Sequence, residues 1–389
     1  MKLAIVNQRY GLEVNGGSEY YTRLLAEHLA KYHEVEILTT KAVDHDTWAN
    51  VYGCDEEIIE GIKVRRFEVK KERTRNFTFI DKVRYKMPWK SRLIEKLWIK
   101  EQGPYTPALI KYIKEHRDEY DLFIFVTYLY YPAAEGMRYV RDKAILIPTA
   151  HDEPYIYMNC FKKNFMQARG ILYLTHEEKD FVQGLFHNQN VLSEVAAIGV
   201  DTPQRVSVTR FRDKYNIQNP YIIYVGRVEE SKGCAKMFRY FKETNQDINL
   251  VVMGKNHMLS VIPKDERIHM LGFVSEEDKM DAISGAVALV LPSHFESLSI
   301  SVLEALALGT PVMVNGECDV LRGHCDRSGA GMCFYDDNSF SQCIATYLKC
   351  DREEIAAKAK KYIRENYTWH TVELRLNEFL ERVVYGERR

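Results

Sequence analysis

Short apolar runs alternate with longer segments of helical periodicity along most of the 389-residue chain. In the first half these runs have the length and composition of strands, and helical patterns such as Ser18–Lys31 and Thr106–Glu119 separate several of them. Strands spaced by helices predict a parallel sheet covered by helices on both faces. The expected strands of the first half are Leu3–Val6, Val35–Thr39, Lys63–Phe67, Leu122–Val126, Ala144–Pro148 and Ile171–Thr175.

The same pattern begins again after a stretch that has no strong period. Asp201–Pro220 contains two prolines and many polar residues, so we predict a linker there. The fold class is therefore α/β, with Rossmann-like domains at residues 1–203 and 204–366. Ligands of such folds bind beyond the carboxyl ends of the strands, which leads us to expect a cleft between the domains. The second series of strands is Tyr221–Val225, Leu250–Met253, His269–Val274, Ala288–Leu291 and Val312–Val314.

The last segment follows the end of the second sheet. Its apolar residues recur at helical spacing through Tyr367–Tyr385, which predicts one long amphipathic helix. We assign residues 367–389 to this segment.

Composition favours a globular protein, with 46% hydrophobic and 28% charged residues. The first apolar run, Leu3–Val6, is too short for a secretory signal, so we expect a cytoplasmic protein with reduced thiols. Cys318, His324, Cys325 and Cys333 lie close together in the sequence, but their spacing matches no standard zinc pattern. We therefore expect no metal site.

Charge is unevenly distributed, although the net charge is only −1. Between residues 61 and 100 there are fourteen lysines or arginines and four acids. This mixture suits an anionic membrane surface, but a solvated face with its own packing aromatics explains it equally well. No nucleic-acid-binding motif accompanies the charge, so no nucleic-acid partner is expected. The aromatic residues of the stretch are Phe77, Phe79, Tyr85, Trp89 and Trp98.

The strongest motif lies in Phe295–Pro311, where the strand Ala288–Leu291 is followed by a helix that begins near Leu298. Unpaired N–H groups at a helix start can hold a diphosphate. Glu296 before the helix and Glu304 within it offer acceptors for sugar hydroxyls. A capping acid and an ordinary helical glutamate are the simpler alternative.

A second motif, Gly226–Gly233, directly follows the strand Tyr221–Val225. Arg227 and Lys232 in this turn are able to neutralise a diphosphate leaving group. Gly226 permits a sharp turn and a close approach to phosphates. The alternative is a surface turn with two solvated cations.

Two further motifs follow strands of the first domain. Gly16 and Gly17 precede the first helix, with Ser18 as a candidate N-cap. No Gly-x-Gly-x-x-Gly pattern is present there, which disfavours a dehydrogenase. His151-Asp152, after Ala144–Pro148, would orient a sugar or move a proton, unless the pair is structural.

These four motifs, in this order, resemble the family-4 retaining glycosyltransferases of the GT-B fold. The resemblance covers nearly the whole chain and is most specific over Tyr221–Val314. It implies that Arg227 and Lys232 bind the donor diphosphate and that Glu304 accepts the ribose hydroxyls. Glu296 would contact the transferred sugar.

The resemblance also implies contributions from the first domain. Gly16 and Gly17 would approach the donor, His151 would contact the sugar near the reacting carbon, and the C-terminal helix would cross back onto this domain. The remaining donor-binding residues would be Gly226, Ser297, Leu298, Ser299 and Ile300. Ser299 stands where the family usually has glycine, so we expect altered donor contacts there.

The implied reaction is transfer of a hexose from a nucleotide diphosphate sugar to a saccharide or lipid-linked saccharide, in polysaccharide or glycolipid synthesis. It would retain the anomeric configuration through same-face attack, without a metal or cofactor. UDP is favoured over GDP as the carrier. Lys63–Lys100 would dock the enzyme on the inner face of a membrane.

Two alternatives remain. A sugar-nucleotide epimerase of the same fold needs proton-transfer groups on both sides of the sugar, and His151 has no clear partner. An inactive nucleotide-sugar-binding scaffold would be expected to have lost one of the two glutamates or cations.

Overall fold

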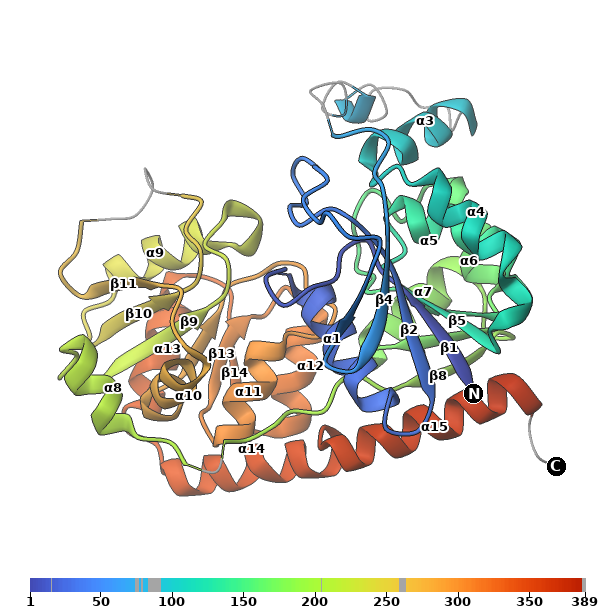
Figure 1. Ribbon diagram of the computed structural model, residues 1–389. Coiled ribbons are helices and arrows are strands. Elements are labelled where there is room, and N and C mark those ends of the chain that lie inside the picture. Colours follow the sequence, from blue (N-terminus) through green and yellow to red (C-terminus); the bar gives the residue numbers. More distant parts are fainter. Residues whose placement is uncertain are drawn as a thin grey trace. The chain divides into compact units, whose positions relative to one another are not determined.

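The chain divides into two compact units. In the computed structural model the described residues are all except 15, 74–76, 78–79, 83–91, 204, 259–263 and 387–389. The first unit is Met1–Ile198 together with Glu373–Arg389, and the second is Gly199–Val372. Each unit contains one sheet flanked by helices (Figure 1).

The first unit is built on an eight-stranded sheet in the order β3-β4-β2-β1-β5-β6-β7-β8. All pairings are parallel except that of the edge strand β3 with β4. Its central strands β1 and β5 are buried on both faces, as expected for a sheet covered by helices. The strands are β1 (Lys2–Val6), β2 (Glu34–Thr40), β3 (Glu56–Ile59), β4 (Ile62–Phe67), β5 (Leu122–Val126), β6 (Ala144–Ile147), β7 (Gly170–Tyr173) and β8 (Leu192–Val195).

Helices cover this sheet, and the C-terminal helix α15 packs against β7. A Cβ on Gly170 would lie 2.9 Å from both Phe379 and Val383, so glycine allows the close approach. Glu373 anchors the same helix by accepting hydrogen bonds from His28, Lys31 and Tyr32. The helices are α1 (Gly17–Leu29), α3 (Arg92–Gln102), α4 (Pro107–Glu115), α5 (Tyr131–Gly136), α6 (Asn159–Gln167), α7 (His176–Phe186) and α15 (Trp369–Tyr385).

The second unit has a six-stranded, fully parallel sheet in the order β11-β10-β9-β12-β13-β14. Its strands are β9 (Tyr221–Val225), β10 (Asn249–Met253), β11 (Ile268–Gly272), β12 (Leu289–Leu291), β13 (Val312–Asn315) and β14 (Gly331–Phe334). Its helices are α8 (Val208–Tyr215), α9 (Cys234–Glu243), α10 (Glu276–Gly285), α11 (Ile300–Leu308), α12 (Asp319–Ser328), α13 (Asp337–Tyr347) and α14 (Arg352–Asn366).

The predicted pair of Rossmann-like α/β domains is confirmed, but the linker prediction is wrong for residues 208–215. Helix α8 occupies them because Phe211 is fully buried and Ser207 caps the helix by accepting from the Arg210 N–H. The chain passes from the first unit to the second between Ile198 and Gly199, whereas the sequence suggested a boundary at 203. Residues 367–372 belong to the second unit, and α15 joins the first unit only from Glu373.

Among the described residues, no helix combines the length and the apolar character that crossing a bilayer requires.

Candidate functional site

The loop after β9 is held rigidly by the neighbouring strand loops. The Tyr224 hydroxyl donates to the Arg227 carbonyl at 2.7 Å, and the Val228 N–H donates to the Lys255 carbonyl at 2.9 Å. The Arg227 side chain is 44% exposed, and its guanidinium pairs with Glu229 at 3.3 Å. This cation is therefore accessible on a fixed backbone.

Glycines bring the backbones of three adjacent loops together. Gly254 and Gly233 both have positive φ angles, 129° and 73°. A Cβ on Gly254 would lie 2.0 Å from the Gly226 carbonyl oxygen, and one on Gly233 would lie 2.4 Å from the Pro292 carbonyl oxygen. Any side chain at these two positions would push the loops after β9, β10 and β12 apart.

Two of the predicted site residues are in direct contact. The Lys232 ammonium lies 2.7 Å from the Glu296 carboxylate, with side chains 27% and 13% exposed. Lys232 follows β9 and Glu296 follows β12, its neighbour in the sheet. The ion pair therefore joins the two strongest motifs of the sequence at the carboxyl edge of the second sheet.

The start of α11 provides unpaired N–H groups next to this ion pair. Its N-cap residue, Ser299, makes no side-chain hydrogen bond to the first turn. The N–H groups of Ile300 and the two residues after it have no partner within the helix and carry partial positive charge. Leu298 is buried, and its carbonyl accepts a 2.8 Å hydrogen bond from His324. The start of this helix is thus fixed in place.

Ser299 has a left-handed backbone conformation, with φ at 68°. A side chain in this region costs roughly 1–2 kcal/mol, a cost that glycine does not incur. We expect Ser299→Gly to stabilise the protein by about 1 kcal/mol after the greater freedom of glycine in the unfolded chain is counted. Chemical unfolding would measure this gain. Ser301→Gly, inside the same helix, is the control and should destabilise by about 0.5 kcal/mol. Loss of stability in both variants would contradict the strain at Ser299.

Glu304 is buried and paired with a residue that the sequence did not suggest. Lys279 on α10 lies 2.9 Å from the Glu304 carboxylate and 2.8 Å from Glu276. Burial raises the pKa of the Glu304 carboxyl, and the Lys279 ammonium opposes that rise. Burial lowers the pKa of Lys279, but the two carboxylates outweigh this effect and raise it overall. Lys279 therefore remains charged and orients Glu304.

In the first unit, Gly16 and Gly17 lie at the start of α1. The helix begins at Gly17, so the N-cap role predicted for Ser18 is wrong; its hydroxyl donates instead to Glu19 at 2.8 Å. Buried Arg9 and Glu19 form an ion pair of 2.5 Å. A Cβ on Gly16 would lie 2.1 Å from this carboxylate, whereas one on Gly17 would meet no atom within 4 Å. Gly16 thus makes room for the ion pair, and Gly17 leaves open space.

His151 pairs with Glu153 and not with Asp152. Its Nε2 lies 3.6 Å from the Glu153 carboxylate, which accepts a 2.7 Å hydrogen bond from the buried Tyr128 hydroxyl. Asp152 instead accepts from the Tyr157 hydroxyl at 2.7 Å. The adjacent residues His151 and Asp152 therefore have different partners, and Tyr128 orients the glutamate beside His151.

Backbone strain surrounds this histidine. Thr127 after β5 and Thr149 after β6 have φ angles of 68° and 51°, and their hydroxyl oxygens lie 3.2 Å apart. Such angles are rare for β-branched residues and cluster at functional sites. The strain thus adds to the motif evidence that the carboxyl edge of this sheet is functional.

Buried Glu178 fixes the chain beside His151. Its carboxylate accepts from the N–H groups of Ala150 at 2.5 Å and Leu174 at 2.7 Å. Burial raises the pKa of Glu178 to about 8, although these two donors oppose the rise. The folded state therefore binds more protons than the unfolded state between the ordinary carboxyl pKa and about 8, and the contribution of this group to stability falls as pH rises.

This linkage predicts a pH effect that a glutamine cannot show. Relative to Glu178→Gln, the wild-type protein should lose stability from pH 5 to pH 8, by at most about 1.4 kcal/mol per pH unit. Thermal unfolding of both proteins at the two pH values measures the difference. Parallel pH profiles would show that Glu178 is ionised in the folded state throughout.

The cysteines and histidine near residue 324 have structural contacts. His324 uses both ring nitrogens, Nδ1 with the Tyr362 hydroxyl at 3.0 Å and Nε2 with the Leu298 carbonyl. Cys325 is buried and interacts with Cys333. These contacts give His324 and Cys325 a structural role.

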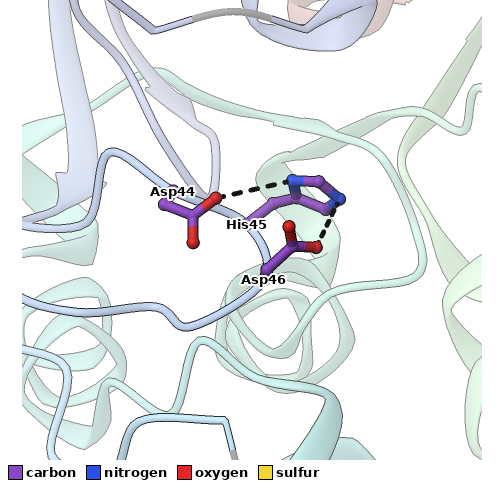
Figure 2. Close-up of side chains that lie close together, drawn as sticks. All are labelled: Asp44, His45 and Asp46. Carbon is purple, nitrogen blue, oxygen red and sulfur yellow. Dashed lines mark ion pairs between the residues drawn. The ribbon is translucent and has the colours of Figure 1, made fainter. Parts of the chain in front are cut away.

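Within the described part of the chain, three potential metal ligands come close together only at Asp44, His45 and Asp46 (Figure 2). The imidazole lies 3.9 Å from Asp44 and 3.1 Å from Asp46, and Asp44 also accepts from the N–H and hydroxyl of Thr47. Both carboxylates are exposed. Local ion pairing accounts for this arrangement.

Part of the basic stretch lies outside the described residues, including Phe79, Tyr85 and Trp89. Trp98 is fully buried and donates to Asp81 at 2.9 Å, and Phe77 packs against it. These two aromatics therefore belong to the core. Many of the described cations are paired with acids: Lys63 and Arg65 with Glu56, Arg66 with Glu57, Lys70 with Glu68, and Lys71 with Glu101.

Comparison with known proteins identifies the second unit. Residues 207–366 match the family described as Glycosyl transferases group 1, so this unit contains a glycosyltransferase group 1 domain.

Two curated relatives carry related names. An uncharacterized glycosyltransferase, MJ1607, of Methanocaldococcus jannaschii is 27% identical over 180 residues, which cover 42% of this chain and 45% of that protein. The second relative, from Campylobacter jejuni, is 27% identical over 166 residues, which cover 38% of this chain and 42% of that protein. It is named N-acetylgalactosamine-N,N'-diacetylbacillosaminyl-diphospho-undecaprenol 4-alpha-N-acetylgalactosaminyltransferase. The chain therefore spans less than half the length of these curated relatives.

Solved structures match nearly the whole chain. Sucrose-phosphate synthase from Thermosynechococcus elongatus has a TM-score of 0.74 at 15% identity, and the match covers 99% of this chain and 100% of that chain. Anabaena HepE in complex with UDP and glucose has a TM-score of 0.71 at 14% identity, covering 98% and 99%. WaaG, a glycosyltransferase involved in lipopolysaccharide biosynthesis, has a TM-score of 0.65 at 14% identity, covering 99% and 100%. These likenesses establish the GT-B fold.

Proposed function

We propose that this protein is a retaining glycosyltransferase that moves a hexose from a UDP-sugar to a saccharide or lipid-linked saccharide. The observation that carries the proposal is the Lys232–Glu296 ion pair, which joins the loop of exposed Arg227 to the loop that leads into α11. These groups lie in a glycosyltransferase group 1 domain. A neighbour of the same fold that binds UDP and glucose supports UDP as the carrier.

Arg227 and Lys232 bind the donor diphosphate together with the N–H groups at the start of α11. Charge on the leaving diphosphate rises as the sugar–oxygen bond breaks, and fixed cations stabilise that charge most when water does not need to reorganise. The loop of Arg227 is held by hydrogen bonds within the protein, so its backbone is already organised. Gly226, Ser297 and Ser299 complete the donor site.

Glu296 binds hydroxyls of the transferred sugar, and the diphosphate replaces it as a partner of Lys232. Glu304 accepts the ribose hydroxyls because Lys279 keeps its carboxylate oriented. We expect Glu304→Ala to weaken UDP binding by about tenfold, the loss typical of a hydrogen bond to a charged group. Isothermal titration with UDP measures it, and unchanged affinity would contradict the ribose role.

The acceptor attacks on the face that the diphosphate leaves, and the departing phosphate takes the acceptor proton. We assign no protein base and no metal to this step. We further propose that Gly16 and Gly17 of the first unit approach the donor and that His151 contacts the transferred sugar. The Tyr128–Glu153 contact sets the orientation of the His151 imidazole.

A membrane surface is a natural location for a lipid-linked acceptor. On α3, Leu93 and Leu97 are 79% and 47% exposed, and Lys96 and Lys100 are exposed on the same helix. Apolar and basic side chains in this combination bind anionic bilayers. If the protein ignores phosphatidylglycerol vesicles at low salt, the membrane part of the proposal fails.

Slow transfer to water gives a test that needs no acceptor. The protein would be incubated with UDP-glucose, UDP-galactose and UDP-N-acetylglucosamine, and released UDP and sugar followed by NMR. We expect one donor to be hydrolysed, with the first sugar released in the configuration of the donor. A sugar released with inverted configuration would refute retention. Formation of an epimerised nucleotide sugar would show that the protein is an epimerase and not a transferase.

A further inference from the structure

A cluster of aromatic and cationic side chains lies at the carboxyl edge of the first sheet, on loops that follow three of its parallel strands. Trp48 follows β2, Arg73 follows β4, and Tyr130 follows β5. Trp48 is fully buried, packs edge-on against Tyr130 at 5.4 Å and donates to the Gln102 carbonyl at 2.8 Å. Ligands of parallel α/β sheets bind at this edge.

The Arg73 guanidinium is partly buried in this cluster without a carboxylate. Its Nη2 donates to the carbonyl and side-chain oxygens of Gln102 at 2.7 and 3.0 Å. Its centre lies 5.1 Å from the Trp48 ring and 4.7 Å from the Phe77 ring. Its Nε is buried and has no hydrogen-bond partner among the residues that the structure describes. Within the described residues Arg73 forms no ion pair.

Neighbouring arginines are neutralised. Arg9 also lies over Trp48, at 5.9 Å, but it pairs with buried Glu19. Arg65 and Arg66, the other arginines between residues 61 and 100 whose side chains are described, both pair with glutamates. Arg73 therefore differs from these arginines in having no carboxylate partner among the described residues.

An uncompensated buried cation is unfavourable by itself. Burial lowers the pKa of Arg73, and the carboxylates of Asp46 and Asp44 oppose this without direct contact. A guanidinium stacked on aromatic rings keeps a planar set of donors, which matches the oxygens of a phosphate or carboxylate.

We propose that Arg73 binds a phosphate or carboxylate group of the acceptor, so that the acceptor is an anionic saccharide or carries an anionic lipid headgroup. That this anion belongs to the acceptor rests on the proposed function, whereas the anion site itself rests on the contacts of Arg73 alone. The carboxylates of Asp44 and Asp46 act on the same guanidinium at longer range, which favours a ligand of low charge.

The test compares glucose 6-phosphate and glucuronate with glucose, by titration calorimetry in excess UDP so that the donor site is filled. We expect the wild type to bind at least one of the two anions and not glucose. Arg73→Gln should weaken that binding about tenfold or more. Lys70→Gln, which removes an exposed cation paired with Glu68 in the same stretch, is the control and should bind like the wild type.

A second variant and a second ligand source sharpen the result. Arg73→Lys keeps the charge but loses the planar donors, so it should also bind weakly, and UDP binding reports whether each variant is folded. Phosphatidylglycerol vesicles compared with phosphatidylcholine vesicles separate a lipid headgroup from a soluble anion. Equal binding by wild type and Arg73→Gln, or no anion binding by the wild type, would overturn the inference. Failure of the wild type to bind UDP would instead refute the proposed function.

Discussion

Replacing Arg227 with alanine is expected to lower kcat/KM by about 10²-fold or more, the scale on which a preorganised group that stabilises developing charge affects rate. The Arg227 side chain is 44% exposed, and among the described residues its only ion pair is with Glu229, so its removal should leave the fold intact. The positive charge of Arg227 would then stabilise the bound diphosphate and would not be needed for the stability of the fold. Steady-state kinetics of UDP release measures the effect.

Arg239→Ala is the matched control for this variant. Arg239 is an exposed cation on α9 of the same unit and lies over the Tyr240 ring at 5.2 Å. It should retain the activity of the wild type. Similar losses in both variants would mean that general electrostatics, and not a contact of Arg227, supports the reaction.

Lys232 and Glu296 should behave as one functional unit. Lys232→Ala leaves the Glu296 carboxylate uncompensated beside the donor phosphates, so we expect a loss of about 10²-fold or more in kcat/KM. Glu296→Ala should lower kcat more than it weakens donor binding, because its sugar contact acts during transfer. Since the two side chains lie 2.7 Å apart, the double variant should lose much less than the product of the single losses.

A double-mutant cycle on kcat/KM tests this coupling. Multiplicative losses would show that the two groups act independently and that their contact has no part in the site. Lys236→Ala provides the control, because this lysine lies on α9 and pairs with Glu317 at 3.6 Å, not with Glu296.

The fold could be predicted from the sequence wherever strands are central. Runs such as those at β1, β5 and β9 are apolar throughout because both faces are covered. The prediction missed β3, β8 and β14, which lie at sheet edges and have partly exposed residues. Helix α8 was missed because its one fully buried residue, Phe211, lies among charged residues.

The candidate site was predictable in its motifs but not in its pairs. Each motif follows a strand, so its place at the sheet edge follows from topology alone. The partners Lys279 and Glu153 were missed, because tertiary packing decides which acid or base each side chain meets. Ser299 was noted as a serine where glycine is usual, and its positive φ gives the physical meaning of that difference.

The central claim is that the second unit binds a nucleotide diphosphate sugar through Arg227. Thermal unfolding of wild type and Arg227→Ala with UDP, GDP, ADP and their common sugars tests it most directly. At 100 times its dissociation constant a ligand stabilises by about 2.7 kcal/mol, which is readily seen. We predict that UDP and one UDP-sugar stabilise the wild type and have much less effect on Arg227→Ala. Stabilisation of neither protein by any nucleotide would contradict the account and favour a scaffold without a donor.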